Sequence, residues 1–167
     1  MTLDEINTLS NDAFVEAFGG LYEHSPWIAE AAADHRPFRD TEDMLAKMEA
    51  VVSNAAREKR LALLRAHPEL AGKAAIDGTL TEASTEEQAS AGLDRMHKHE
   101  FDALTQMNST YSEHFGFPFI ICVKLTTKAG ILQALADRLE NTPDEEFETA
   151  LAEVGKIVRL RLEGIVS

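Results

Sequence analysis

TPDEEFETALAEVGKIVRLRLEGI, residues 142–165, is the stretch that most directly indicates a helical fold. It begins with Thr142 before Pro143, the arrangement of a capping side chain followed by a proline at the first helical position. Glu145 adds the spacing of a capping box. Four apolar residues and one arginine then recur at helical intervals on one face: Val154, Ile157, Val158, Arg161 and Ile165. The segment therefore predicts one long amphipathic helix.

Similar signals recur along the rest of the chain. Ser25 before Pro26 repeats this helix start, and Thr41 and Ser53 are weaker starts of the same kind. Apolar residues between these points are three or four positions apart, as in Phe14, Phe18 and Leu21 or Leu132, Leu135 and Leu139. We therefore expect an all-α protein, a single compact domain over residues 1–167 with about eight helices.

Three segments lack the helical pattern. Asp77–Thr81 begins with an Asp-Gly pair typical of a loop, and Gly116–Pro118 predicts a turn. Phe119–Val123 is a short apolar run without a second strand to pair with, so it cannot form a sheet. We expect it to be an extended, buried connector whose backbone N–H and C=O groups need partners.

The composition limits the partners of the chain. A formal net charge of −13 argues against nucleic acid and anionic membrane surfaces, because both attract clustered lysine and arginine. An anionic ligand would then need a specific buried cation. The single cysteine fits a reducing compartment. No long apolar run follows the acidic start Met1–Glu5, so we expect no signal peptide, no transmembrane segment and a cytoplasmic location.

His67 lies at a predicted helix end. The residue before a proline is pushed away from helical backbone angles, so Pro68 should end the preceding helix near His67. An imidazole beside a helix C-terminus is favoured in its protonated form by the helix dipole, which suits a group that moves protons. The alternative is a capped helix end that carries a surface histidine.

Ser84, Glu87 and Gln88 form a second polar cluster. Ser-x-x-Glu is the spacing of a capping box, which alone would explain the first two residues. The alternative is a binding site, since the Gln88 amide can donate and accept hydrogen bonds toward a polar ring. A helix N-terminus near Ser84 would also favour an anion.

Arg161 interrupts the apolar face of the last predicted helix. A guanidinium keeps its proton, so a buried one needs an anionic or hydrogen-bonding partner. That partner is either one of the 29 acidic residues, in a structural salt bridge, or an anionic ligand.

The remaining histidines give no metal-binding pattern. There is no His-Glu-x-x-His motif, and in a helix His97 and His99 would lie on different faces. Cys122 lies in an apolar run, where a thiol acts as a small hydrophobic group and not as a nucleophile.

Four segments in this order resemble the 2-oxo-4-hydroxy-4-carboxy-5-ureidoimidazoline (OHCU) decarboxylases, a family of urate breakdown. They are FGGLYEHSPW (18–27), RAHPELAG (65–72), STEEQ (84–88) and FGFPFI (115–120), and the ending Leu160-Arg161-Leu162 also fits. The resemblance spans nearly the whole chain. It implies an all-α fold of the OHCU decarboxylase type, a homodimer, and conversion of OHCU to (S)-allantoin and CO2 without a cofactor or metal.

The resemblance also implies roles for individual residues. His67 corresponds to the family's catalytic histidine and Glu87 to its acidic partner. The substrate-binding positions correspond to Pro68, Ser84, Gln88, the backbone of Phe119, Ile120 and Ile121, and Arg161. The substrate would be a small anion. Two rival interpretations stay open: a decarboxylase of a related ureido or imidazoline acid, and a non-catalytic helical interaction module.

Overall fold

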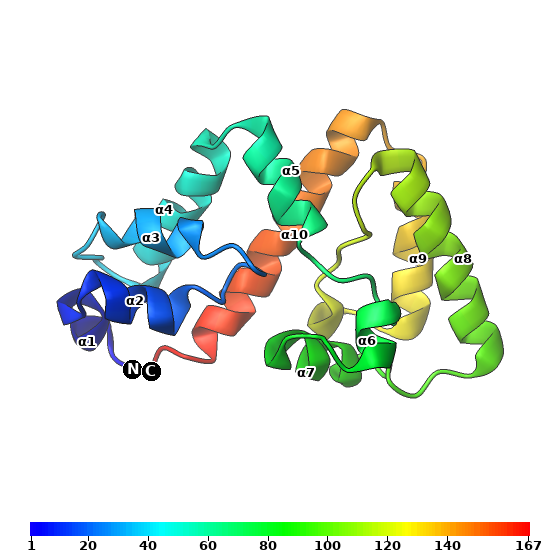
Figure 1. The fold of residues 1–167 in the computed structure, drawn as a ribbon, viewed down its shortest axis with the longest axis horizontal. Helices are drawn as coiled ribbons and strands as arrows, with labels where there is room; N and C mark the ends of the chain where they lie inside the picture. The colour runs from blue at the N-terminus through cyan, green and yellow to red at the C-terminus, as the bar shows by residue number, and fades with distance from the viewer. The chain divides into compact units, whose positions relative to one another are not determined.

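The computed structural model describes the backbone of residues 1–167 and every side chain except those of residues 73 and 74. Over this backbone it has ten α-helices, eight of them with seven residues or more, one short 3-10 helix and no strand. The predicted all-α class is confirmed. In chain order the elements are α1 (Leu3–Thr8), α2 (Asn11–Phe18), α3 (Trp27–Ala33), α4 (Thr41–Asn54), α5 (Arg57–Arg65), α6 (Lys73–Asp77), α7 (Glu82–Ser90), α8 (Lys98–Phe115), η1 (Val123–Leu125), α9 (Lys128–Arg138) and α10 (Pro143–Glu163) (Figure 1).

These elements form two compact units. The first unit comprises residues 1–66 and 155–167, and the second comprises residues 67–154. Helix α10 contributes its first half to the second unit and its second half to the first. The single domain expected over residues 1–167 stays a prediction. None of the helices described is both long and apolar enough to cross a membrane.

In the first unit, α3 packs against α2 and α4. The fully buried side chains of this core come from all of these helices and from α1: Ile6, Phe14, Phe18, Ile28, Met44 and Met48. The two ends of the chain lie beside each other (Figure 1), and the Ser167 N–H donates to the Met1 carbonyl at 2.9 Å. The last turns of the chain therefore close onto its first residue.

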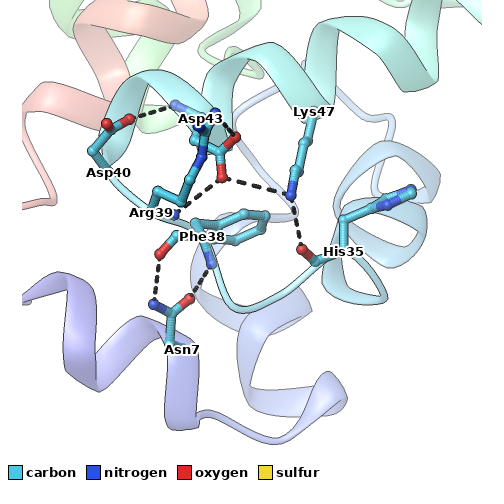
Figure 2. A network of polar contacts seen from close by, with 7 residues as sticks. All are labelled: Asn7, His35, Phe38, Arg39, Asp40, Asp43 and Lys47. Atoms are coloured by element: carbon cyan, nitrogen blue, oxygen red, sulfur yellow. Dashed lines mark hydrogen bonds and ion pairs between the residues drawn. The ribbon is translucent and has the colours of Figure 1, made fainter.

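A polar network joins the start of α4 to α1 (Figure 2). The Asn7 amide donates to the Phe38 carbonyl at 2.9 Å and accepts from the Phe38 N–H at 2.8 Å. Asp43 accepts from the Arg39 backbone N–H at 3.0 Å and from its guanidinium at 2.9 Å, with Lys47 3.5 Å away. The hydrogen bonds from Arg39 lower the pKa of Asp43 to about 2. Asp43 is therefore a charged, buried centre of this corner.

The helix starts differ in detail from the sequence patterns. Thr142 caps α10 as predicted, since its hydroxyl accepts from the Glu145 N–H at 3.3 Å. The expected start at Thr41 is one residue late, because Asp40 is the N-cap of α4 and accepts from the Asp43 N–H at 2.7 Å. Aspartate and threonine are both common at the N-cap. Here the Asp40 carboxylate, and not the Thr41 hydroxyl, accepts from a backbone N–H of the first helical turn.

Two other predicted caps are wrong, although α3 does begin two residues after Ser25, at Trp27. The Ser25 hydroxyl donates to the Glu23 carbonyl and makes no cap to α3. Ser53 lies in the last turns of α4, where its hydroxyl donates to the Glu49 carbonyl at 2.9 Å. Serine hydroxyls can satisfy a preceding carbonyl as readily as a following N–H, so the pattern alone did not fix their role.

In the second unit, α8 ends at Phe115, and its C-cap Gly116 has φ = 81°, in the left-handed region, at the start of the turn predicted over Gly116–Pro118. Residues 118–122 then run without regular structure, and Phe119, Ile120 and Cys122 are each 3% exposed or less. The predicted buried connector is confirmed. Aromatic rings surround its start, with Tyr111 edge-on to Phe119 at a centroid distance of 5.3 Å.

Candidate active site

His67 is buried in the second unit. Helix α5 ends at Arg65 with Ala66 as its cap, as the proline at position 68 predicted, and His67 begins an irregular segment that runs to Gly72. We call residues 67–72 the His67 connector. The His67 residue is only 8% exposed. The alternative interpretation as a surface histidine is therefore wrong.

One peptide group of the His67 connector is held on both sides. The Ala71 N–H donates to Gln88 Oε1 of α7 at 3.0 Å, and the Leu70 carbonyl accepts from Asn108 Nδ2 of α8 at 3.0 Å. Ala71 has φ = 50°, in the left-handed region that non-glycine residues avoid. Two buried amides thus fix a peptide whose local conformation is unfavourable.

The polar cluster on α7 is not a cap. Thr81 is the N-cap, and its hydroxyl accepts from the Ser84 N–H at 3.2 Å, so Ser84 lies inside the helix. The capping-box interpretation of Ser84 and Glu87 is therefore wrong. The predicted helix N-terminus near Ser84 is present, and binding of an anion there stays a prediction.

Ser84, Glu87 and Gln88 lie on one side of α7, since residues three and four apart share a helix face. Ser84 and Gln88 are buried, and Glu87 is partly exposed. The same helix packs against η1, with an ion pair of 3.5 Å between Glu86 and Lys124. Helix α7 thus contacts the His67 connector through Gln88 and the end of the Phe119–Cys122 connector through η1.

The Phe119–Cys122 connector is held by charged side chains. Arg138 of α9 donates to the Ile120 carbonyl at 2.7 Å, and its guanidinium lies 4.4 Å from the centre of the Phe119 ring. Glu153 of α10 accepts from the Cys122 N–H at 3.2 Å. The Ile120 carbonyl, part of the backbone that the resemblance assigned to substrate, therefore already accepts from a protein donor.

Glu146 is the centre of a buried polar network behind this connector. It is fully buried and accepts from Tyr111 and Arg138, while Asn141 donates to its other oxygen at 2.9 Å. Burial and the Glu146 carboxylate raise the pKa of Tyr111 well above its usual value, so the phenol stays a donor. The network fixes the guanidinium that in turn fixes the connector.

Arg161 belongs to the first unit. Its guanidinium donates to Glu23 Oε2 at 2.9 Å and to the Leu21 carbonyl at 3.2 Å. The side chains of Arg161 and Glu23 are 8% and 1% exposed. The structural salt bridge that the sequence left open is therefore present, and a role of Arg161 in binding substrate stays a prediction.

The pairing of His67 with Glu87 and the contacts of Pro68 and Ile121 with a ligand also stay predictions. The predicted separation of His97 and His99 is wrong, because His97 caps α8 from outside the helix and the two rings stack 5.7 Å apart. Among the residues described, no three His, Cys, Asp or Glu side chains form a group that could hold a metal ion.

Sequence reasoning missed the residues that hold the site's backbone. Asn108, Arg138, Glu146 and Glu153 are all buried and polar. Asn108 and Glu153 lie at buried helix positions where apolar residues are usual. The signal available in the sequence was a polar residue on a helix face that is otherwise apolar. Their partners are 31 to 38 positions away along the chain, which no local pattern reveals.

Comparison with known proteins shows the family of this chain. The model of the OHCU decarboxylase family matches residues 7–163. The chain is 44% identical to the 2-oxo-4-hydroxy-4-carboxy-5-ureidoimidazoline decarboxylase of Haloferax volcanii over 162 residues, which cover 97% of this chain and 94% of the relative. It is 40% identical to the protein of the same name from Halalkalicoccus jeotgali, over 98% of this chain and 90% of the relative.

A solved structure is similar as well. The crystal structure of an (S)-allantoin synthase superposes with a TM-score of 0.80 at 28% identity, over 99% of this chain and 54% of the other. The all-helical fold of this chain therefore has a counterpart among solved structures. The chain belongs to the OHCU decarboxylase family, which confirms the resemblance found in the sequence.

Proposed function

We propose that this protein is a carboxy-lyase that converts OHCU to (S)-allantoin and CO2 without a cofactor. Family membership and relatives that bear this name support the activity. The structural observation that carries the proposal is the burial of His67 on a connector held to α7 through Gln88. A buried imidazole on a fixed backbone is suited to acid-base chemistry at one position of a bound substrate.

The substrate can itself accept the electron pair that decarboxylation leaves behind. Decarboxylation leaves an electron pair on carbon, and most decarboxylases use pyridoxal phosphate or thiamine to accept it. In OHCU the carboxylated carbon lies beside a ring C=N bond, so the pair can move onto nitrogen. The protein then has to supply orientation, electrostatic stabilisation and one proton.

His67 is the acid-base group in this proposal, and Glu87 holds it. His67 moves a proton between the substrate hydroxyl or ring nitrogen and the product carbon. Protonation from one face yields a single enantiomer. The partial exposure of Glu87 on the same side of α7 as the buried Ser84 and Gln88 supports its placement beside a substrate.

The binding roles follow from the hydrogen bonds already made. Gln88 Oε1 accepts from Ala71, so its amide nitrogen is the part that donates to a substrate carbonyl. Because Arg138 occupies the Ile120 carbonyl, the backbone groups proposed for substrate are the Ile120 N–H and those of Phe119 and Ile121. Ser84 and Pro68 complete the proposed set, with Arg161 as the predicted cation.

The proposed partner is a small anion, as the resemblance to the OHCU decarboxylases implies, and the net charge of −13 disfavours nucleic acid and anionic membranes as partners. A homodimer and a cytoplasmic location remain part of the proposal.

The substrate is tested by comparing turnover of freshly generated OHCU with turnover of neighbouring purine-catabolic intermediates. The proposal predicts a saturable acceleration of OHCU loss and none for the others. Preference for a different ureido or imidazoline acid would make the chain a related decarboxylase. No acceleration with any of them would favour a non-catalytic interaction module.

A further inference from the structure

We propose that Asn108 is a positioning residue of the reaction: its buried amide, together with Gln88, fixes the Leu70–Ala71 peptide and through it the placement of His67. The inference rests on the proposed role of His67 in catalysis. Asn108 lies on α8, outside every segment that the sequence assigned to the site.

The geometry is that of a clamp on a single peptide group. The Leu70 carbonyl and the Ala71 N–H belong to the same peptide, and each is 3.0 Å from its amide partner. Asn108 and Gln88 are 4% and 6% exposed, so both bonds lie largely away from bulk water. One helix holds the donor side of the peptide and another helix holds the acceptor side.

The clamp opposes a local preference. Ala71 adopts φ = 50°, which a residue with a Cβ takes only when its surroundings require it. At Gly72 an added Cβ would lie 2.7 Å from the Glu69 Cβ, so the segment also folds tightly onto itself. Loss of one amide bond would therefore let the peptide turn toward a more ordinary conformation.

The Asn108 side chain acts here as a hydrogen-bond donor. Its Oδ1 atom is buried and has no hydrogen-bond partner among the residues that the structure describes. A buried acceptor without a partner is unfavourable, and an apolar side chain would avoid this cost. The bond from Nδ2 to the Leu70 carbonyl is the contact that offsets it.

A shift of the Leu70–Ala71 peptide should also displace His67, because the segment between them is short and conformationally restricted. Only Pro68 and Glu69 lie between His67 and Leu70, and the proline ring fixes its own φ and restricts the residue before it. A displacement of about 1 Å in a catalytic group can reduce turnover by about 10²-fold. We therefore expect the effect of Asn108 in kcat more than in KM.

Asn108→Asp removes the hydrogen-bond donor and leaves the size and shape of the side chain almost unchanged. A carboxylate cannot donate to the Leu70 carbonyl, so kcat at pH 8 should fall by about 10²-fold with KM changed much less. A protonated carboxyl can donate, and burial together with Glu69, which lines the same cavity, favours that form. The ratio of variant to wild-type kcat should therefore rise as the pH falls.

Asn108→Leu also removes the donor but adds no charge, so it distinguishes loss of the hydrogen bond from the effect of a new carboxylate. The residue borders a cavity of about 200 Å³, so a leucine of similar size can be accommodated. This variant should lose the same activity and show no recovery at low pH. It also provides the test if the carboxylate prevents folding.

Asn7→Asp is the matched control, because Asn7 donates an equivalent bond to the Phe38 carbonyl in the other unit. It should lower the melting temperature and leave kcat unchanged. Wild-type kcat in both Asn108 variants, or a loss no larger than that of the control, would overturn the proposal.

The outcome also separates this inference from the proposed function. If the wild-type protein does not turn over OHCU, the function fails, and the clamp is then read from hydrogen exchange at the Ala71 amide. Faster exchange in Asn108→Leu than in wild type supports the clamp, and equal exchange refutes it.

Discussion

Arg161 and Glu23 form a buried ion pair: the guanidinium donates to the carboxylate at 2.9 Å, and the two side chains are 8% and 1% exposed. The sequence showed only that an arginine interrupts an apolar helix face. The structure supplies its partner from a segment 138 positions earlier in the chain. The same guanidinium is the cation predicted for the substrate, so its two roles must be separated by measurement.

The main effect of Arg161→Ala should be a loss of folding stability. Removal of one partner of a buried pair leaves an uncompensated charge and costs about 3–5 kcal/mol. Arg159→Ala is the control, since its pair with Glu42 is exposed and should contribute little. Thermal unfolding compares the two variants. A melting temperature for Arg161→Ala equal to that of the control, with KM raised, would assign Arg161 to substrate alone.

His67→Asn should reduce kcat by about 10²- to 10⁴-fold, the usual contribution of a general acid-base group. The helical circular dichroism and the melting temperature should stay near those of wild type, because asparagine is smaller and still polar. Steady-state kinetics on freshly generated OHCU makes the measurement. Retained turnover would remove His67 from the mechanism.

Glu87→Gln should change the pH profile more than the fold. A carboxylate beside an imidazole stabilises the protonated form of the ring. Its loss should move the limb of the kcat/KM profile assigned to His67 to lower pH. A profile that does not move would mean that the two side chains do not interact.

Asp43 should make the first unit sensitive to acid. Its pKa is lowered to about 2 by Arg39, below the usual value of a free carboxyl, so it stabilises the fold above about pH 4. That contribution is lost as the pH falls from about 4 to about 2. Asp43→Asn should therefore have a lower melting temperature than wild type at pH 6, and the difference should shrink by pH 2. A constant difference over this range would contradict the ion-pair network in Figure 2.

The sequence predicted the parts of the fold that depend on neighbours in the chain. Pro68 ends a helix through its own ring, and Gly116 ends α8 through a left-handed turn. The long helix after Thr142 follows from a local cap and a regular apolar face. Such signals need no knowledge of distant residues, which is why the helical class could be predicted.

The sequence could not predict the contacts that hold the site. Ser84 and Glu87 fit a capping box, but Thr81 fits the N-cap as well, and only the fold decides between them. The bond from Asn108 to Leu70 and the bond from Arg138 to Ile120 join residues 38 and 18 positions apart. These pairs depend on how helices pack, and no local pattern encodes them.

The most direct test of the account follows circular dichroism while urate, uricase and hydroxyisourate hydrolase generate OHCU in the presence or absence of this protein. The account predicts rapid appearance of the circular dichroism of one allantoin enantiomer with the wild-type protein, and slow formation of racemic allantoin without that signal with His67→Asn. Slow, racemic product with the wild-type protein would contradict it.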